Sequence, residues 1–292
     1  MHEARQQRTI AAPTTVEGFG YWSSQDIRLE FRPAEPRTGI VFVRGDLQPA
    51  VRIPARLEHR VESPRRTTLR HGGASVEMIE HVMASLAGLQ IDNCEVWVDA
   101  AEMPGCDGSS LPFVEALTVV GVEEQPAIQP HMIVSEQTRV GDDNQWIEVR
   151  PNRSAGFEVK YRLDYGRDNA IGRQTLAMRI TPDAFRREIA PCRTFLLEHE
   201  ADWLRSQGLG ARTSQSDLLI YGPLGPLGNQ LRFPDECVRH KVLDFVGDLA
   251  LAGCDLVGAF TAHRSGHRLN AELVRALLAE GEVICGDWKR TA

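Results

Sequence analysis

The stretch that decides the fold is VRHKVLDFVGDLALAGCDLVGAFTA, residues 238–262. Its first part predicts a helix from Val238 to Leu251, because apolar residues recur at helical spacing and the stretch ends in LAG, whose glycine is a common helix stop. The segment CDLVGAFTA then predicts a strand. A turn that contains SGH follows, and after it we expect a second helix from Asn270 to Ala279.

The first half of the chain has the same order of elements. Apolar residues at three- and four-residue steps predict a helix from Ser75 to Leu89, with its own LAG at 86–88. The strand CEVWVDA, a turn that contains DGS, and a helix that opens near Pro112 come next. We therefore interpret the two halves as repeats of one α+β unit.

Segments outside this unit add strands and a boundary. IRLEFRP and GIVFVRG in the first third, and WIEVRP and FEVKYRLDY later, alternate as strands do. Residues 124–130 are polar and contain two prolines, which is typical of a linker, and residues 208–228 predict an irregular region rich in Gly. The sequence thus predicts two similar α+β domains, residues 1–125 and residues 126–292.

Charge and composition exclude some classes of function. The chain has 292 residues, of which 42% are hydrophobic and 25% charged, as expected for a globular protein without long disorder. The 40 acidic and 33 basic residues give a net charge of -7. This charge argues against general nucleic-acid binding, which needs a basic surface.

The sequence predicts a cytoplasmic protein without a transmembrane segment. The N-terminal stretch has no apolar core, and no later stretch reaches the roughly 18 apolar residues that a spanning helix needs. The six cysteines are scattered singly, without CxxC spacing. We expect them to be reduced thiols that lie mostly in the core.

The sharpest chemical signal lies on the helix predicted at 238–251. His240, Asp244 and Asp248 are four residues apart, so their side chains share one helical face. Zinc accepts imidazole nitrogen and carboxylate oxygen, and a catalytic zinc site uses three protein ligands and a water molecule. Alone, the pattern fits a solvated helix face at least as well.

The equivalent helix of the first half carries Glu80 and His81. If the two helices face each other, His81 would bring a third ligand to the same ion. Glu80, about 100° away around the helix, would stand beside the attacking water as a general base. A Glu-His pair by itself is common by chance.

Two further residues could serve amide hydrolysis. His267 lies in the turn before the last predicted helix, where it could donate a proton to a leaving amine, and Asp248 is the carboxylate expected to orient it. Thr194, in CRTFLL, is a hydroxyl donor that could stabilise an oxyanion. The alternatives are a capping or surface histidine and a structural threonine.

Six segments together resemble the zinc-dependent UDP-3-O-acyl-N-acetylglucosamine deacetylases, in matching order and spacing over nearly the whole chain. They are GFGYWSSQDIRLEFRPA at 18–34, IEHVMASLAGLQIDN at 79–93, MPGCDGSSLPFVEAL at 103–117, RTFLL at 193–197, RHKVLDFVGDLALAG at 239–253 and AFTAHRSGHRLN at 259–270.

The resemblance implies a metal-dependent amide hydrolase of lipid A biosynthesis. In such an enzyme His81, His240 and Asp244 would ligate Zn²⁺, and Fe²⁺ suits the same ligands. Glu80 would act as the base and His267 as the acid. The substrate would be a UDP-amino sugar with an acyl chain, and we expect a monomer with no nucleic-acid partner.

The resemblance also implies roles for residues around the metal. Asp248 would support the acid, and Thr194 would stabilise the oxyanion. Lys241 and Phe195 would line the sugar site, while Tyr165 would stack on the uracil. The implied fold is two α+β domains, each a helix layer on a β-sheet, with the helix layers packed together in a β-α-α-β sandwich and the active site between the domains.

Three departures from the family pattern concern substrate contacts. The run GYWSS at residues 20–24 lacks the histidine and the final glycine of the family's Gly-Leu-His-Ser/Thr-Gly, because Trp22 replaces the histidine. Gln145 stands where some members place a phosphate-contacting lysine, and the loop at 208–222 has Arg212 in place of the usual Gly-Gly-Ser continuation. A deacetylase for a different N-acetylated sugar is therefore an alternative. A noncatalytic sugar-nucleotide binding protein is a further one.

Overall fold

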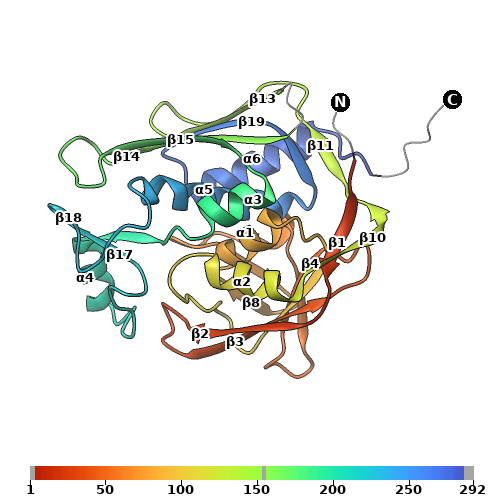
Figure 1. The fold of residues 1–292 in the computed structure, drawn as a ribbon, viewed down its shortest axis with the longest axis horizontal. Helices are drawn as coiled ribbons and strands as arrows, with labels where there is room; N and C mark the ends of the chain where they lie inside the picture. The colour runs from red at the N-terminus through yellow and green to blue at the C-terminus, as the bar shows by residue number, and fades with distance from the viewer. Residues whose placement is uncertain (1–3, 153–155, 286–292) are drawn as a thin grey trace.

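Two β-sheets enclose a double layer of helices, in the order sheet, helices, helices, sheet (Figure 1). The computed structural model describes residues 4–152 and 156–285. Each half of the chain supplies one sheet and the helices that cover its inner face (Figure 1). The predicted α+β sandwich of two similar units is confirmed.

The first sheet is built from strands of the N-terminal half, in the order β2-β3-β9-β4-β5. Its central strand β9 runs antiparallel to β3 and parallel to β4. The strands are β2 (Thr14–Phe19), β3 (Asp26–Pro33), β4 (Ile40–Arg44), β5 (Val51–Pro54) and β9 (Cys94–Val98).

The second sheet repeats this arrangement strand for strand, in the order β12-β13-β19-β14-β15. Its central strand β19 again runs antiparallel to one neighbour, β13, and parallel to the other, β14, while β11 adds a short parallel pairing. The strands are β11 (His131–Ile133), β12 (Thr138–Gly141), β13 (Trp146–Arg150), β14 (Phe157–Asp164), β15 (Arg173–Arg179) and β19 (Asp255–His263).

In each half one helix precedes the central strand and another follows it. In the first half these are α1 (Glu80–Gly88) and α2 (Leu111–Val120), and in the second half they are α5 (Glu236–Leu249) and α6 (His267–Glu280). The equivalent helices α1 and α5 pack against each other in the middle of the sandwich. The repeat predicted from the two LAG segments is thus present in the topology.

Shorter elements complete the fold. The pair β1–β10 lies apart from the two main sheets, and a small unit of α4 with β16, β17 and β18 projects at the left of Figure 1. Their bounds are β1 (Gln6–Ile10), β6 (Arg60–Val61), β7 (Thr68–His71), β8 (Ala74–Glu77), β10 (Val122–Ile128), α3 (Pro182–Ala184), β16 (Phe195–Leu197), α4 (Glu198–Ser206), β17 (Leu219–Gly222) and β18 (Gly225–Pro226), with single turns of other helix types at Leu57–His59, Phe185–Ile189 and Ala250–Ala252.

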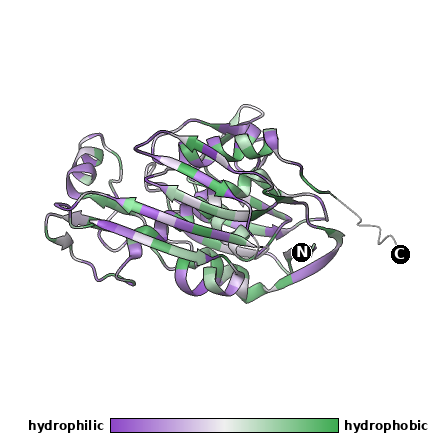
Figure 2. Ribbon diagram, turned by 90° about the horizontal axis from the view of Figure 1, so that it is seen from above, coloured by the Kyte–Doolittle hydropathy of each residue, from purple (hydrophilic) through white to green (hydrophobic). Residues whose placement is uncertain are grey.

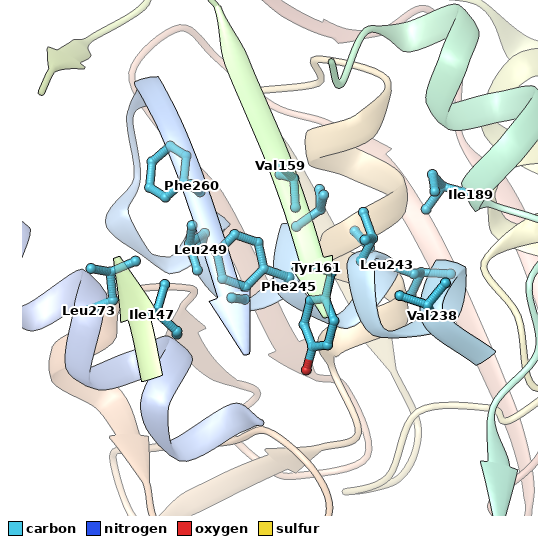
Figure 3. Packing of buried hydrophobic residues seen from close by; sticks show 14 of the residues in the cluster. Ile147, Val159, Tyr161, Ile189, Val238, Leu243, Phe245, Leu249, Phe260 and Leu273 are labelled. Carbon is cyan, nitrogen blue, oxygen red and sulfur yellow. The ribbon is translucent and has the colours of Figure 1, made fainter. Parts of the chain in front are cut away.

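The core of the second half packs around α5. Figure 3 shows Phe245 and Leu249 of this helix beside Phe260 of β19. The ring centroids of Phe245 and Phe260 are 6.0 Å apart, and the rings are inclined by 69°, an edge-to-face arrangement that aromatic pairs favour. Nearly all of α5 is buried. The imidazole and carboxylates of this helix therefore lie inside the sandwich.

Among the described residues, no helix covers the outer face of the second sheet (Figure 1). Figure 2 looks down on this sheet, and hydrophilic residues interrupt apolar ones along its strands. Along β15, exposed and half-buried residues alternate from Arg173 to Arg179. This is the pattern of a sheet with one face on a core and one in solvent.

Some predicted boundaries are wrong. Ala74–Glu77 pairs with β7 as a hairpin strand, and Met78 has a positive φ of 58°, so the helix begins only at Glu80. The predicted linker at 124–130 lies largely in β10, because this segment pairs with β1. The predicted irregular region at 208–228 contains β17 and β18. The last helix begins at His267 and not at Asn270.

The structure bears on two expectations, one about the cysteines and one about membrane-spanning helices. All six cysteines are free thiols, and Cys94, Cys192, Cys237 and Cys254 are buried, whereas Cys285 is exposed. The expectation of thiols that lie mostly in the core is confirmed. Among the helices of residues 4–152 and 156–285, none is both long enough and apolar enough to cross a membrane.

Candidate active site

His81, His240 and Asp244 come together where α1 packs against α5. One possible donor atom from each residue lies within 4.8 Å of the others. Asp244 Oδ1 is 3.5 Å from His240 Nε2 and 3.7 Å from His81 Nε2. Two ligands of a tetrahedral zinc ion, each about 2.1 Å from it, are about 3.4 Å apart. The two measured distances therefore match the spacing of ligands around a single metal ion.

The protonation states of these buried residues suit metal binding. Burial, reinforced by neighbouring His240, lowers the pKa of His81 to about 3, and burial also lowers the pKa of His240. Burial acts to raise the pKa of Asp244, but the Lys241 ammonium and nearby imidazoles outweigh it and hold that pKa well below its usual value. At neutral pH the site offers two neutral imidazoles and one carboxylate, the forms that bind a metal ion.

Hydrogen bonds orient two of the three ligands. His240 Nδ1 is 3.1 Å from the carbonyl oxygen of Cys192, which can only accept, so Nδ1 carries the proton and Nε2 is left with a lone pair. Lys241 Nζ donates to Asp244 Oδ2 at 2.5 Å, while Oδ1 is the oxygen nearest the imidazoles. The donor set and its supports fit a divalent ion such as Zn²⁺.

Glu80 precedes His81 in α1 and is buried next to it. Its Oε2 accepts a hydrogen bond of 3.0 Å from the backbone N–H of Thr67. Burial raises the pKa of Glu80 to about 7, although the positive charge of His267 opposes the shift. A carboxylate with a pKa near neutrality can take up and release a proton during turnover.

Asp248 and His267 form a hydrogen-bonded pair near Glu80. His267 Nδ1 is 2.8 Å from Asp248 Oδ2, and because the carboxylate accepts, Nδ1 donates and Nε2 stays available. Burial acts to lower the pKa of His267, but the charge of Asp248 and this hydrogen bond raise it to about 9. The imidazole is therefore protonated at neutral pH, as a general acid must be.

A cleft of about 1020 Å³ connects these groups with the predicted substrate contacts. Phe195, Tyr165 and Lys241 all line it. The ring centroid of Phe195 is 5.9 Å from that of Tyr165 and 6.1 Å from that of His240. An aromatic wall thus extends from His240, a predicted metal ligand, to Tyr165, whose side chain remains 38% exposed.

Thr194 lines the same cleft, immediately before β16. Its backbone N–H donates to the carbonyl of Gly108 at 2.7 Å, and its carbonyl accepts from the N–H of Leu219 at 2.9 Å. Within the described part of the chain its hydroxyl forms no hydrogen bond, so the backbone is fixed while the hydroxyl is left for a ligand.

All three sequence departures reach the cleft, because the 208–222 loop contributes Leu209, Gly210 and Thr213 to its lining. Trp22 and Gln145 are lining residues, and the guanidinium of Arg66 lies 4.5 Å from the Trp22 ring centroid. Arg212 is engaged elsewhere, because it forms a 2.7 Å ion pair with Asp26. Its charge is therefore already paired.

Two polar residues that contact Asp248 were not expected from the sequence. Thr67 Oγ1 donates to Asp248 Oδ1 at 2.5 Å, and Asn270 Nδ2 donates to Asp248 Oδ2 at 2.7 Å. Asn270 lies three residues after His267 in α6, a spacing that could have indicated a shared helix face. No local pattern indicates Thr67, because its partner Asp248 lies in the other half of the chain.

Comparisons with known proteins cover nearly the whole chain. The family model described as UDP-3-O-acyl N-acetylglycosamine deacetylase (LpxC) matches residues 7–279. Relatives named UDP-3-O-acyl-N-acetylglucosamine deacetylase from Shewanella sp. (strain W3-18-1) and Shewanella violacea are each 40% identical to the chain over 279 residues, and that from Shewanella oneidensis is 39% identical over the same length. Each match covers 94% of this chain and 90% of the relative.

Proposed function

This chain belongs to the UDP-3-O-acyl-N-acetylglucosamine deacetylase family, and from that membership we propose that it hydrolyses the N-acetyl group of UDP-3-O-acyl-N-acetylglucosamine. The products are acetate and the free amine, and the reaction belongs to lipid A biosynthesis. The observation that carries the proposal is the buried group of His81, His240 and Asp244 beside a carboxylate and a protonated imidazole.

We propose Zn²⁺ as the ion, held by the two histidine Nε2 atoms and Asp244 Oδ1. When bound, the ion would supply Lewis-acid polarisation of the acetamide carbonyl and of a water molecule. Lys241 holds the second oxygen of Asp244, which keeps this carboxylate ionised and in one orientation. Fe²⁺ suits the same ligands, so metal analysis must distinguish the two ions.

Glu80 is the proposed general base. Its pKa of about 7 leaves a large fraction ionised at neutral pH, so that it can take a proton from the attacking water. The Thr67 N–H holds one of its oxygens, which leaves the other for the proton. Positioned general acid–base catalysis of this kind accelerates a reaction by about a hundredfold to ten-thousandfold.

His267 is the proposed general acid, and Thr194 is the proposed donor to the oxyanion. With Nδ1 bound to Asp248, the protonated ring can donate from Nε2 to the departing amine nitrogen. Asp248 keeps the ring charged until that transfer. The Thr194 hydroxyl stands on a backbone fixed at both its N–H and its carbonyl, which favours a preorganised contact with the developing negative charge.

For the substrate we propose contacts with Lys241, Phe195 and Tyr165. These residues line the cleft, and the partly exposed ring of Tyr165 is able to stack on a flat base such as uracil. The Lys241 ammonium already binds Asp244, so its contact with the sugar would be made by hydrogens that Asp244 does not use.

We further propose that the enzyme acts as a monomer in the cytoplasm. All of the proposed catalytic residues come from one chain, and the free thiols suit a reducing compartment. We also propose a division into two domains, residues 1–125 and residues 126–292. Strand β10 runs across this boundary and connects the two domains.

The direct test is release of acetate from UDP-3-O-acyl-N-acetylglucosamine by the zinc-loaded protein, with Glu80→Gln as the inactive control. Turnover by the wild type and loss of turnover in the variant support the proposal. A wild-type protein that binds zinc but leaves this sugar intact refutes the assigned substrate. Release of acetate from other N-acetylated sugars would then favour a deacetylase for a different N-acetylated sugar. Trp22 and Gln145 suggest this alternative, because both depart from the family pattern and both line the cleft.

A further inference from the structure

We infer that Thr67 is a positioning residue that holds the general base and the general acid in one fixed arrangement, an inference that rests on the proposed function. Thr67 lies in the first half of the chain, immediately before β7, and it is 1% exposed. Its backbone and its hydroxyl contact different catalytic residues.

The backbone of Thr67 is attached to the start of α1. Its N–H donates to Glu80 Oε2 at 3.0 Å, and its carbonyl accepts from the N–H of Ile79 at 3.4 Å. The next residue, Thr68, pairs with Glu77 in the β7–β8 ladder. These contacts fix Thr67 relative to α1 and hold the base from one side.

The hydroxyl of Thr67 reaches the second half of the chain. Oγ1 donates to Asp248 Oδ1 at 2.5 Å and lies 3.3 Å from His267 Nδ1. Asp248 Oδ2 already accepts from His267 and from Asn270. In the described residues Thr67 supplies the only hydrogen bond to Oδ1, so it completes the set that fixes the carboxylate of the acid pair.

One residue therefore links the base on α1 to the acid pair on α5 and α6. Glu80 and Asp248 are both acidic, and each accepts a hydrogen bond from Thr67. The N–H of Thr67 donates to the Glu80 carboxylate, and its O–H donates to the Asp248 carboxylate. These two hydrogen bonds offset the repulsion between the two carboxylates. The base and the acid must act on the same amide, and a small displacement of either is costly to the rate.

The test compares three variants of the zinc-loaded full-length chain. Thr67→Val keeps the shape of the side chain but removes its hydroxyl, and Thr67→Ser keeps the hydroxyl. Thr68→Val is the matched control, because the neighbouring Thr68 hydroxyl is equally buried and has no hydrogen-bond partner among the described residues. We expect Thr67→Val to lower kcat by about tenfold to a hundredfold, because a small misplacement of a catalytic group has a cost of this order.

The pattern across the variants separates positioning from a general loss of structure. We expect KM and zinc content to stay near wild type in Thr67→Val, and kcat to be largely recovered in Thr67→Ser and unchanged in Thr68→Val. Equal losses in Thr67→Val and Thr68→Val, or a Thr67→Val enzyme with wild-type kcat, would overturn the inference.

A second measurement needs no turnover. In ¹⁵N-histidine-labelled protein, the Nδ1–H signal of His267, assigned by its absence in His267→Gln, should be protected from solvent exchange in the wild type and in Thr67→Ser. It should exchange faster in Thr67→Val. If the wild type fails to hydrolyse the acylated UDP sugar, the proposed function fails, but this signal still decides whether Thr67 holds the pair, and an unchanged exchange rate in Thr67→Val rejects it.

Discussion

Gly247 of α5 packs directly against the carbonyl oxygen of Glu80 on α1, so that a Cβ at position 247 would overlap this oxygen. The proposed metal ligands His240 and Asp244 lie on the same helix as Gly247, and His81 follows Glu80 in α1. Because Gly247 has no side chain, helices α1 and α5 can pack closely against each other.

Gly247→Ala should destabilise the protein even though it adds a better helix former. In an open helix, alanine would stabilise by roughly 1 kcal/mol relative to glycine. Here the added methyl group pushes α5 away from α1, and overpacking of this kind costs about 1–3 kcal/mol. Denaturant unfolding of the metal-free protein measures the change in the free energy of unfolding. A variant at least as stable as the wild type would show that the helices can separate without cost.

Replacing a ligand and replacing the base should have different effects on metal content. We expect His81→Ala and Asp244→Ala to lose both bound zinc and activity, because each leaves two protein ligands. Glu80→Gln should keep the zinc and lose about a hundredfold to ten-thousandfold in kcat. Elemental analysis measures the zinc content of each variant, and kinetics measures its activity. His199→Ala is the control, because His199 is an exposed histidine on α4. Wild-type zinc content in Asp244→Ala would contradict the ligand assignment.

The pH profile of kcat/KM should be bell-shaped. Activity rises as Glu80 loses its proton, with a pKa of about 7 that a bound cation would lower, and falls as His267 loses its proton near its pKa of about 9. His267→Gln should therefore have low activity and no alkaline limb, while the acidic limb remains. If the alkaline limb persists in His267→Gln, another group is the acid.

A positive charge at position 145 should strengthen binding of the nucleotide sugar. Gln145 lines the cleft, whereas the adjacent Asn144 is an exposed residue that does not. We expect Gln145→Lys to lower KM for the UDP sugar by about threefold to tenfold at low salt, and the gain to shrink as salt screens the charge. Asn144→Lys, with the same change in net charge, should leave KM unchanged. Equal effects of the two variants would show that only the overall charge matters.

The helix that carries the proposed metal ligands His240 and Asp244 could be predicted because the pattern that indicates it is local. His240, Asp244 and Asp248 recur every four residues, and helix geometry alone places them on one face. The LAG segments and the strands that follow them likewise indicated the repeat, which the equal strand orders of the two sheets confirm. Which residues meet across the two halves could not be derived in this way.

The boundaries that were predicted wrongly show where local patterns are ambiguous. Apolar spacing at 75–79 suits a helix, but Ser75, Val76 and Glu77 pair with β7. The proline-containing segment at 124–130 suits a linker, but β1 provides a partner strand. In both cases a segment distant from the local pattern decided the structure.

By itself the sequence determined the repeat, the helix that carries two of the proposed metal ligands, and the family resemblance, because these depend on residue order along the chain. Only the tertiary structure decided that Thr67 joins Glu80 to Asp248, that His81 meets His240, and that His267 is a cation at neutral pH. Hydrogen bonds and pKa values depend on burial and on neighbours that are distant along the chain, and folding alone brings those neighbours together.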